Sequence, residues 1–144
     1  MRIVLDTNIL VSSLLSPLGR PASIYSAWRD GRFTLVTCER QIDEIRDTLH
    51  KPYFQLRIRH YRAGRLINQI RSQAEFIESL PRVERSPDPT DDFLLALCEA
   101  GNADYLVTGD KHGLLSLGNH KETRIIASTS FAASFENVSR AGGA

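Results

Sequence analysis

The sequence has only two cysteines, Cys38 and Cys98, among its 144 residues, and it contains no long hydrophobic run. Both cysteines lie in segments with helical patterns and lack the spacing of metal ligands, which indicates small buried side chains in a reducing compartment. No apolar stretch approaches the roughly 20 residues of a membrane-spanning helix, so we expect no membrane association. Because a strand-like run follows Arg2 directly, we also expect no signal peptide and a cytoplasmic location.

The sequence also lacks internal repeats and low-complexity segments, and its composition is ordinary for a globular protein. Hydrophobic residues make up 42% and charged residues 24% of the chain. A chain of this length is typical of one domain that buries most of its unfolded surface. We therefore predict a single domain over residues 1–136 and a flexible tail over residues 137–144.

The near-zero net charge of +1 conceals a separation of basic and acidic residues along the chain. Residues 51–85 carry eight basic and three acidic side chains, whereas residues 86–144 carry four basic and eight acidic ones. A basic middle beside an acidic end fits a polyanion-binding face next to a metal-binding pocket. A solvated arginine-rich helix is the simpler alternative, and the charge pattern alone does not separate the two.

Hydrophobic periodicity predicts strands that alternate with helices along the chain. The predicted strands are residues 2–6, 33–37, 104–108 and 124–127, with a further short strand near Val83. The predicted helices are residues 21–31, 39–50, 53–80 with a break near Gly64, a helix from Asp91 or Asp92 to Gly101, and residues 130–135. This alternation implies crossover connections, so we predict a three-layer α/β/α sandwich around a mainly parallel sheet of four to five strands.

The first predicted strand ends on a carboxylate. Ile3, Val4 and Leu5 form a short apolar run of the kind that fills the centre of a parallel sheet, and Asp6 follows at once. In open α/β sheets, ligands bind outside the carboxyl ends of the strands. Asp6 therefore lies at the expected place for chemistry, although capping of the following helix is an equally good interpretation of this segment alone.

Other acidic residues are expected at the same edge of the sheet. They are Asp110 beyond the strand that ends at Thr108, Asp91 or Asp92 at the start of a helix, and Asp43 or Glu44 in the helix after the second strand. Each one alone could be a cap, a turn residue or an exposed ion-pair partner. Together they predict a carboxylate cluster, because the carboxyl ends of parallel strands meet at one edge.

A carboxylate cluster without histidine or cysteine is typical of a site for Mg²⁺ or Mn²⁺. Clustered carboxylates raise one another's pKa unless a cation lies between them. Two such ions about 4 Å apart would bind the attacking and leaving oxygens of an in-line phosphodiester hydrolysis.

These segments together resemble the PIN (PilT N-terminus) domain family, and most of all its subgroup of VapC-like toxin components of toxin–antitoxin systems. The resemblance covers roughly residues 1–131. It rests on four segments. They are residues 4–8 (Val-Leu-Asp-Thr-Asn), Glu44 in the predicted helix that follows residues 35–37 (Leu-Val-Thr), residues 88–92 (Asp-Pro-Thr-Asp-Asp) and residues 103–111 (Ala-Asp-Tyr-Leu-Val-Thr-Gly-Asp-Lys).

The resemblance implies a Mg²⁺- or Mn²⁺-dependent endoribonuclease with an acidic quartet. The quartet corresponds to Asp6, Glu44, Asp92 and Asp110, with Asp92 preferred over Asp91 and Glu44 over Asp43 by their register in the family pattern. Supporting roles are implied for Thr7, Asn8, Asp91 and Thr108, and RNA contacts are expected from Arg57, Arg62 and Arg65. Many family members carry a further acid after the Asp110 position, which this chain lacks, so a complete second metal site is not implied.

The resemblance also implies partners: RNA, a cognate antitoxin and a second copy of the chain in a homodimer. A haloacid-dehalogenase-type phosphatase would need an aspartate where this chain has Asn8, and a receiver domain would need an acid pair before Asp6. The remaining alternative is a non-catalytic RNA-binding or protein-interaction module on the same scaffold. Metal-dependent cleavage of RNA, and its loss on Asp6→Asn, would distinguish the two.

Overall fold

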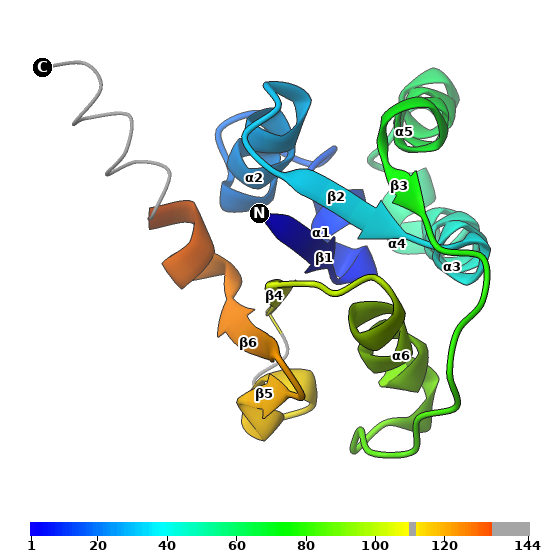
Figure 1. Ribbon diagram of the computed structural model, residues 1–144. Coiled ribbons are helices and arrows are strands. Elements are labelled where there is room, and N and C mark those ends of the chain that lie inside the picture. Colours follow the sequence, from blue (N-terminus) through cyan, green and yellow to red (C-terminus); the bar gives the residue numbers. More distant parts are fainter. Residues whose placement is uncertain (110–111, 134–144) are drawn as a thin grey trace, which may run out of the picture.

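The computed structural model describes residues 1–109 and 112–133, which form a six-stranded sheet with helices on both faces (Figure 1). The strand order is β3-β2-β1-β4-β6-β5, and every neighbouring pair is parallel except β5 with β6. The strands are β1 (Arg2–Leu5), β2 (Thr34–Thr37), β3 (Glu75–Phe76), β4 (Tyr105–Thr108), β5 (Asn119–His120) and β6 (Thr123–Ala127). The helices are α1 (Thr7–Ser12), α2 (Arg20–Arg29), α3 (Glu39–Leu49), α4 (Pro52–Gln55), α5 (His60–Gln73) and α6 (Asp92–Ala100), with short 3-10 turns η1 (Pro89–Asp91) and η2 (Leu114–Leu117). Residues 128–133 are also helical, so the predicted helix over residues 130–135 begins two residues earlier than expected, and its predicted end lies outside the described residues.

Alternate residues of the central strands point into two separate apolar cores. Ile3 and Leu5 of β1 pack with α1, α2, α3 and α5, whereas Val4 packs with α6. On β4, Val107 belongs to the first core and Leu106 to the second. This alternation is the period-two pattern of strands with both faces covered, and it produces three layers, with α2 and α6 on opposite sides of the sheet (Figure 1).

The predicted three-layer α/β/α sandwich with a mainly parallel sheet is therefore confirmed. The four longer strands lie within one residue of their predicted bounds, because each is a buried β-branched or aromatic run. The sheet has six strands rather than four to five, since β3 and β5 contain only two residues each and have no sequence pattern of their own. Within the described residues, none of the helices combines the length and the apolar character that crossing a membrane requires.

The prediction of one long helix over residues 53–80 is wrong. The chain forms α4, turns at residues 56–59, and begins α5 at His60, while Gly64 lies inside α5 and causes no break. Ile58 in the turn is 7% exposed and belongs to the first core. Burial of this side chain requires the chain to turn, and this tertiary contact outweighs the continuous helical pattern.

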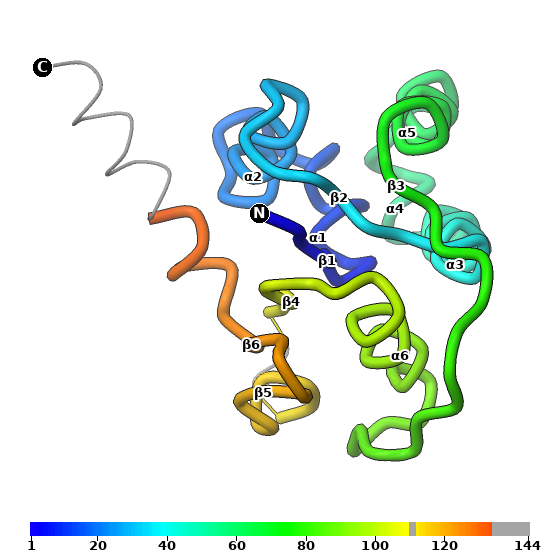
Figure 2. The backbone as a smooth tube through the Cα atoms, in the orientation of Figure 1, coloured from blue at the N-terminus to red at the C-terminus, as the bar shows by residue number. Residues whose placement is uncertain are grey.

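The chain becomes extended after α5 instead of remaining helical. Glu75 and Phe76 pair with the edge of β2, and Ile77 N donates to Thr37 O at 2.9 Å. The predicted strand near Val83 is wrong: residues 77–88 have no regular structure and run along the outside of the molecule to α6 (Figure 2).

The position of α6 follows from its tight contact with the sheet at its C-terminal end. A Cβ on Gly101 would lie 2.6 Å from Val36 Cγ1 and 3.0 Å from Leu97 O, so only glycine fits there. Arg2, at the start of β1, donates from Nε to Gly101 O at 2.7 Å. Because the end of α6 lies beside the start of β1, the start of α6 at Asp92 faces the carboxyl edge of the sheet.

Candidate functional site

Asp6 occupies the junction between β1 and α1. Its backbone N donates to Val107 O at 2.9 Å, and its carbonyl accepts from Ile9 N at 3.0 Å, so the backbone is fixed by both β4 and α1. Among the described first-turn amides of α1, none donates to the Asp6 carboxylate, which excludes a simple helix cap. The side chain is 8% exposed, and its Oδ2 accepts from Thr108 Oγ1 at 2.8 Å.

Threonine ends both strands that flank the site on either side of β1. Thr108, the last residue of β4, donates its hydroxyl to Asp6. Thr37, the last residue of β2, donates its hydroxyl to Gln41 Oε1 at 2.6 Å. Both threonines are fully buried. The same sequence, Leu-Val-Thr, therefore places a hydroxyl donor at each of these two strand ends, and each donor holds one polar side chain of the carboxyl edge.

Glu44 approaches the site from α3. Burial of the half-buried Glu44 side chain raises the pKa of its carboxyl, and the negative charge of Asp6 raises the pKa further. The Thr7 hydroxyl donates a hydrogen bond to Glu44 and opposes the increase. Asp43, by contrast, is exposed and lies 3.9 Å from Arg46 in an ion pair. Of the two neighbouring acids on α3, Glu44 is therefore the one that faces Asp6.

Gln41 is a component of the site that sequence reasoning missed. It is fully buried on α3, one turn before Glu44, and its Nε2 donates to Leu5 O at 2.7 Å and Thr7 Oγ1 at 3.4 Å. With the bond from Thr37, this side chain joins the ends of β1 and β2 to the start of α1. A polar residue three positions before an inward acid, on the apolar face of a helix, was the available signal.

Asp92 is the first residue of α6 and is held by a different kind of contact. Its Oδ1 accepts from Arg85 N at 3.0 Å and from Ser86 N at 2.7 Å, so the carboxylate is bound to the irregular segment before η1. Asp91 is half-buried at the N-cap position of α6, and no amide of the described first turn donates to its side chain.

Two of the predicted site residues, Asn8 and Asp110, are not placed against the other acids by the described contacts. Asn8 is exposed in the first turn of α1. Asp110 lies outside the described residues. Within residues 1–109 and 112–133, no group of three or more His, Cys, Asp or Glu side chains is arranged to hold a metal ion. The described part of the site consists of the facing pair Asp6 and Glu44, with Asp92 at the same edge.

The donor set fits a hard divalent cation. Asp6, Glu44 and Asp92 offer only oxygen ligands, which Mg²⁺ and Mn²⁺ prefer. Burial and, to a smaller extent, the nearby charge of Asp6 raise the pKa of the Glu44 carboxyl, and a cation between the two carboxylates would stabilise their charged forms. Next to Asp92, the Ser86 hydroxyl oxygen is buried without a hydrogen-bond partner among the described residues, which leaves an oxygen available to a metal-bound water.

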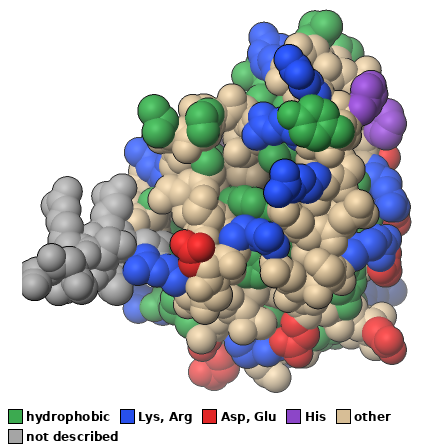
Figure 3. Space-filling model, turned by 90° about the horizontal axis from the view of Figure 1, so that it is seen from above, with side chains coloured by type: hydrophobic (Ala, Val, Ile, Leu, Met, Phe, Trp, Pro, Cys, Tyr) green, Lys and Arg blue, Asp and Glu red, His purple; other side chains and the backbone are tan. Residues whose placement is uncertain are grey.

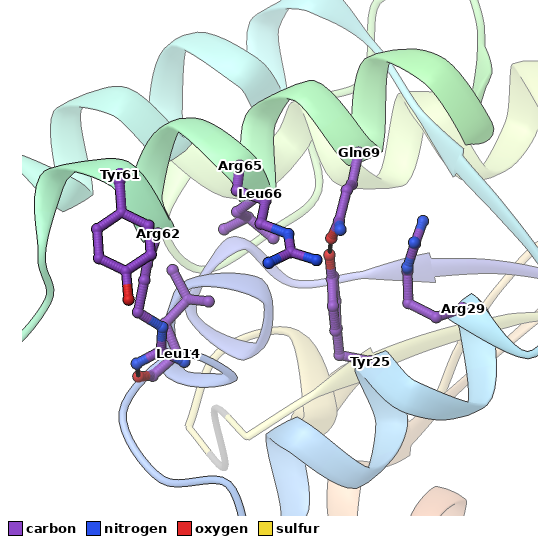
Figure 4. A pocket seen from close by; sticks show the side chains of 8 residues that line it. All are labelled: Leu14, Tyr25, Arg29, Tyr61, Arg62, Arg65, Leu66 and Gln69. Atoms are coloured by element: carbon purple, nitrogen blue, oxygen red, sulfur yellow. Dashed lines mark hydrogen bonds between the residues drawn. The ribbon is translucent and has the colours of Figure 1, made fainter.

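A second candidate feature is a cavity between α2 and α5, with a volume of about 350 Å³ (Figure 4). Its lining combines arginines with tyrosines: Leu14, Tyr25, Arg29, Tyr61, Arg62, Arg65, Leu66 and Gln69. Tyr25 donates its hydroxyl to Gln69, and Arg62 Nη1 donates to Leu14 O at 2.9 Å, so the two walls are joined. Figure 3 shows basic side chains across this upper face, with acidic ones toward its rim.

Arg57 is separated from that cavity, although it was predicted to act with Arg62 and Arg65. Its guanidinium Cζ lies 3.9 Å from the centre of the Tyr53 ring, and its Nη1 donates to Tyr53 O at 2.9 Å. Arg62 and Arg65 instead share the cavity with Arg29, which the sequence analysis did not single out. The structure therefore brings two of the three predicted arginines together.

Comparisons with known proteins identify the fold and the family. A crystal structure of VapBC2 from Rickettsia felis, bound to a DNA fragment from their promoter, superposes with a TM-score of 0.56 at 16% identity. The match covers 88% of this chain and 98% of that chain. No curated protein sequence matches this chain. The family model of the PIN domain matches residues 2–112, which is more than half of the sequence, and the chain therefore belongs to the PIN domain family.

Proposed function

We propose that this protein is a metal-dependent endoribonuclease, in which Asp6, Glu44, Asp92 and Asp110 bind Mg²⁺ or Mn²⁺. PIN domains are generally nucleases that use divalent metals, and this chain is a member of that family. The observation that carries the proposal is the pair formed by Asp6 and Glu44. These two acids, 38 positions apart, face each other at the carboxyl edge of the sheet, where burial and mutual repulsion raise the pKa of Glu44.

The described residues would prepare the site in three ways. Thr108 donates to one oxygen of Asp6 and fixes the direction of its carboxylate, while Thr7 does the same for Glu44. Gln41 fixes the backbone that carries Asp6, because it bonds Leu5 O. A bound ion would supply an activated water and neutralise the charge that develops on the phosphate. Asn8 and Asp91 are proposed as further supports of the acidic cluster.

The arginine-lined cavity between α2 and α5 is proposed to contact the RNA backbone. Arg29, Arg62 and Arg65 supply positive charge along one groove, and Tyr61, which is 66% exposed, offers a ring for a base. Arg57, in the turn after α4, would add a further contact. Such binding is expected to weaken as salt increases and to have little sequence preference.

We also infer a cognate antitoxin as a partner and a homodimer as the assembly. The inference rests on the fold shared with VapBC2 of Rickettsia felis and on the family resemblance of the sequence. Light scattering of the purified chain, alone and with the candidate partner, tests both assemblies directly.

The nuclease proposal is tested by cleavage of a short single-stranded RNA with Mn²⁺ or Mg²⁺. We expect cleavage by the wild type, loss of cleavage with a chelator, and a decrease of about 100-fold or more in Asp6→Asn. Asp43→Asn is the matched control, because Asp43 is an exposed acid next to Glu44, and it should cleave like the wild type. RNA binding without metal-dependent cleavage would favour the non-catalytic module instead.

A further inference from the structure

The segment that holds Asp92 packs on the second core through Ile77, Leu80 and Val83, and its last part is fixed by polar contacts. Residues 77–88 connect β3 to η1 without regular structure, and Figure 2 shows them on the outside of the molecule. At the end of this segment, Arg85 N and Ser86 N both donate to Asp92 Oδ1, at 3.0 and 2.7 Å. The direction of the Asp92 carboxylate therefore depends on where these two amides lie.

The side chain of Arg85 anchors those amides to the β5–β6 hairpin. Arg85 Nη1 donates to Asn119 O at 2.6 Å and lies 3.0 Å from His120 Nδ1. A guanidinium can only donate, so Nδ1 must accept and the His120 ring carries its proton on Nε2. His120 is 6% exposed, which leaves its ring little freedom to move.

Glu99, near the C-terminal end of α6, holds the other side of the His120 ring. His120 Nε2 lies 2.6 Å from Glu99 Oε2, and Lys121 Nζ lies 2.6 Å from Glu99 Oε1. Hydrogen bonds from Lys121 and His120 lower the pKa of Glu99, so it remains an acceptor near neutral pH. Asp92 and Glu99 are seven residues apart, which places them on one face of the helix two turns apart.

The contacts form a closed ring in the order Asp92, Arg85, His120 and Glu99, and α6 closes it. We propose that Arg85 is a positioning residue for Asp92, and that His120 and Glu99 act through it by holding its guanidinium in place. The proposal rests on the metal-binding role assigned to Asp92 above. Residues that orient a ligand in this way typically change metal affinity by about 10- to 100-fold when they are removed.

The first arm of the test measures the segment without any metal. Hydrogen exchange of the Ser86 amide reports whether its bond to Asp92 persists. We expect exchange to be about 10-fold faster in Arg85→Ala and His120→Ala. It should be partly restored in Arg85→Lys, because lysine keeps the charge and can donate, although it lacks the planar fork of the guanidinium. Arg82→Ala is the matched control, since Arg82 lies in the same segment and pairs only with the exposed Glu84 among the described residues.

The second arm measures Mn²⁺ affinity by calorimetry on the same variants. We expect Arg85→Ala and His120→Ala to bind Mn²⁺ about 10-fold more weakly than the wild type, and Arg82→Ala to bind equally well. In Asp92→Asn, a further Arg85→Ala substitution should change the affinity little, because both act on the same ligand. Thermal unfolding of each variant confirms that it is folded.

The outcomes separate this inference from the proposed function. Unchanged Ser86 exchange in Arg85→Ala would overturn the positioning role. Faster exchange with unchanged Mn²⁺ affinity would also overturn it, because Arg85 would then hold the segment but not the ligand. A wild type that binds no Mn²⁺ would overturn the proposed function, whereas the Ser86 exchange would still decide whether Arg85 holds Asp92.

Discussion

The two acidic sides of the candidate site are positioned by different means. Asp6 lies between two regular elements. Its backbone amide donates to β4, its carbonyl accepts the first hydrogen bond of α1, and its carboxylate accepts from the buried Thr108 at the end of β4. Asp92 begins a helix, but its carboxylate is held by two amides of an irregular, largely exposed segment. The first side is fixed by the packing that makes the sheet, whereas the second depends on a few contacts that can be removed without damaging the core.

The largest effect is expected from Gln41→Leu on the first side. This change removes the acceptor of Thr37 and the donor to Leu5 O, all within a fully buried region. Each orphaned group costs about 1–3 kcal/mol, so we expect a loss of about 2–4 kcal/mol of unfolding free energy in urea. Gln73→Leu, on the exposed surface of α5, should cost far less, and an equal loss in both variants would argue against a buried network.

The next effect concerns the bond between Thr108 and Asp6. Thr108→Val keeps the side-chain shape but leaves the buried carboxylate without this donor, which should destabilise the protein by about 1.5–3 kcal/mol. Thr108→Ser keeps the hydroxyl and should recover much of that loss. Thr34→Val, at an exposed position of β2, serves as the control for adding a valine to a strand. Similar stability of the valine and serine variants at position 108 would contradict the role of the hydroxyl.

A smaller effect is expected on the second side. Ser86→Pro removes one of the two amides that donate to Asp92, and we expect a loss of only about 0.5–1.5 kcal/mol. Its effect on Mn²⁺ affinity should nevertheless exceed that of changes elsewhere in residues 77–84. A loss as large as that of Gln41→Leu would show that the two sides are equally built into the core.

The smallest expected effect is a gain of stability, in Glu44→Gln, whereas the preceding variants lose stability. Because the folded state raises the pKa of Glu44, it binds a proton more tightly than the unfolded chain, so this residue lowers stability as pH rises through its folded pKa. Without metal, Glu44→Gln should therefore be slightly more stable than the wild type at pH 7 and equal to it below the ordinary glutamate pKa. Melting temperatures across this range check the sign.

The control for that experiment is Asp43→Asn, since Asp43 is the exposed neighbour of Glu44. It should show no such gain at pH 7. Saturating Mn²⁺ should reverse the order of Glu44→Gln and the wild type, because only the carboxylate would bind the ion strongly. A destabilised Glu44→Gln at pH 7 without metal would contradict the raised pKa of Glu44.

Much of the fold could be predicted because its signals are local. The run before Asp6 and the strand that ends at Thr37 are short apolar runs rich in β-branched residues, whereas the apolar run after Asp92 is longer and ends at Gly101, so length and flanking residues distinguish strand from helix. The turn at Ile58 and the strand β3 could not be predicted, because both depend on partners distant in sequence. Ile58 turns the chain to reach the first core, and β3 exists only because the edge of β2 accepts it.

The sequence alone was enough to place Asp6 at the carboxyl end of β1 and Asp92 at the start of α6, because strand ends and helix starts are local features. The family pattern favours Glu44 over Asp43, but the packing of α3 is what turns Glu44 toward Asp6 and leaves Asp43 exposed, since both residues carry the same carboxylate. Tertiary structure also introduced Gln41, Thr37, Arg85 and His120, whose partners lie on other elements. Hydrogen bonds between distant segments leave no pattern in a single sequence, and these bonds are what fix the carboxylates in place.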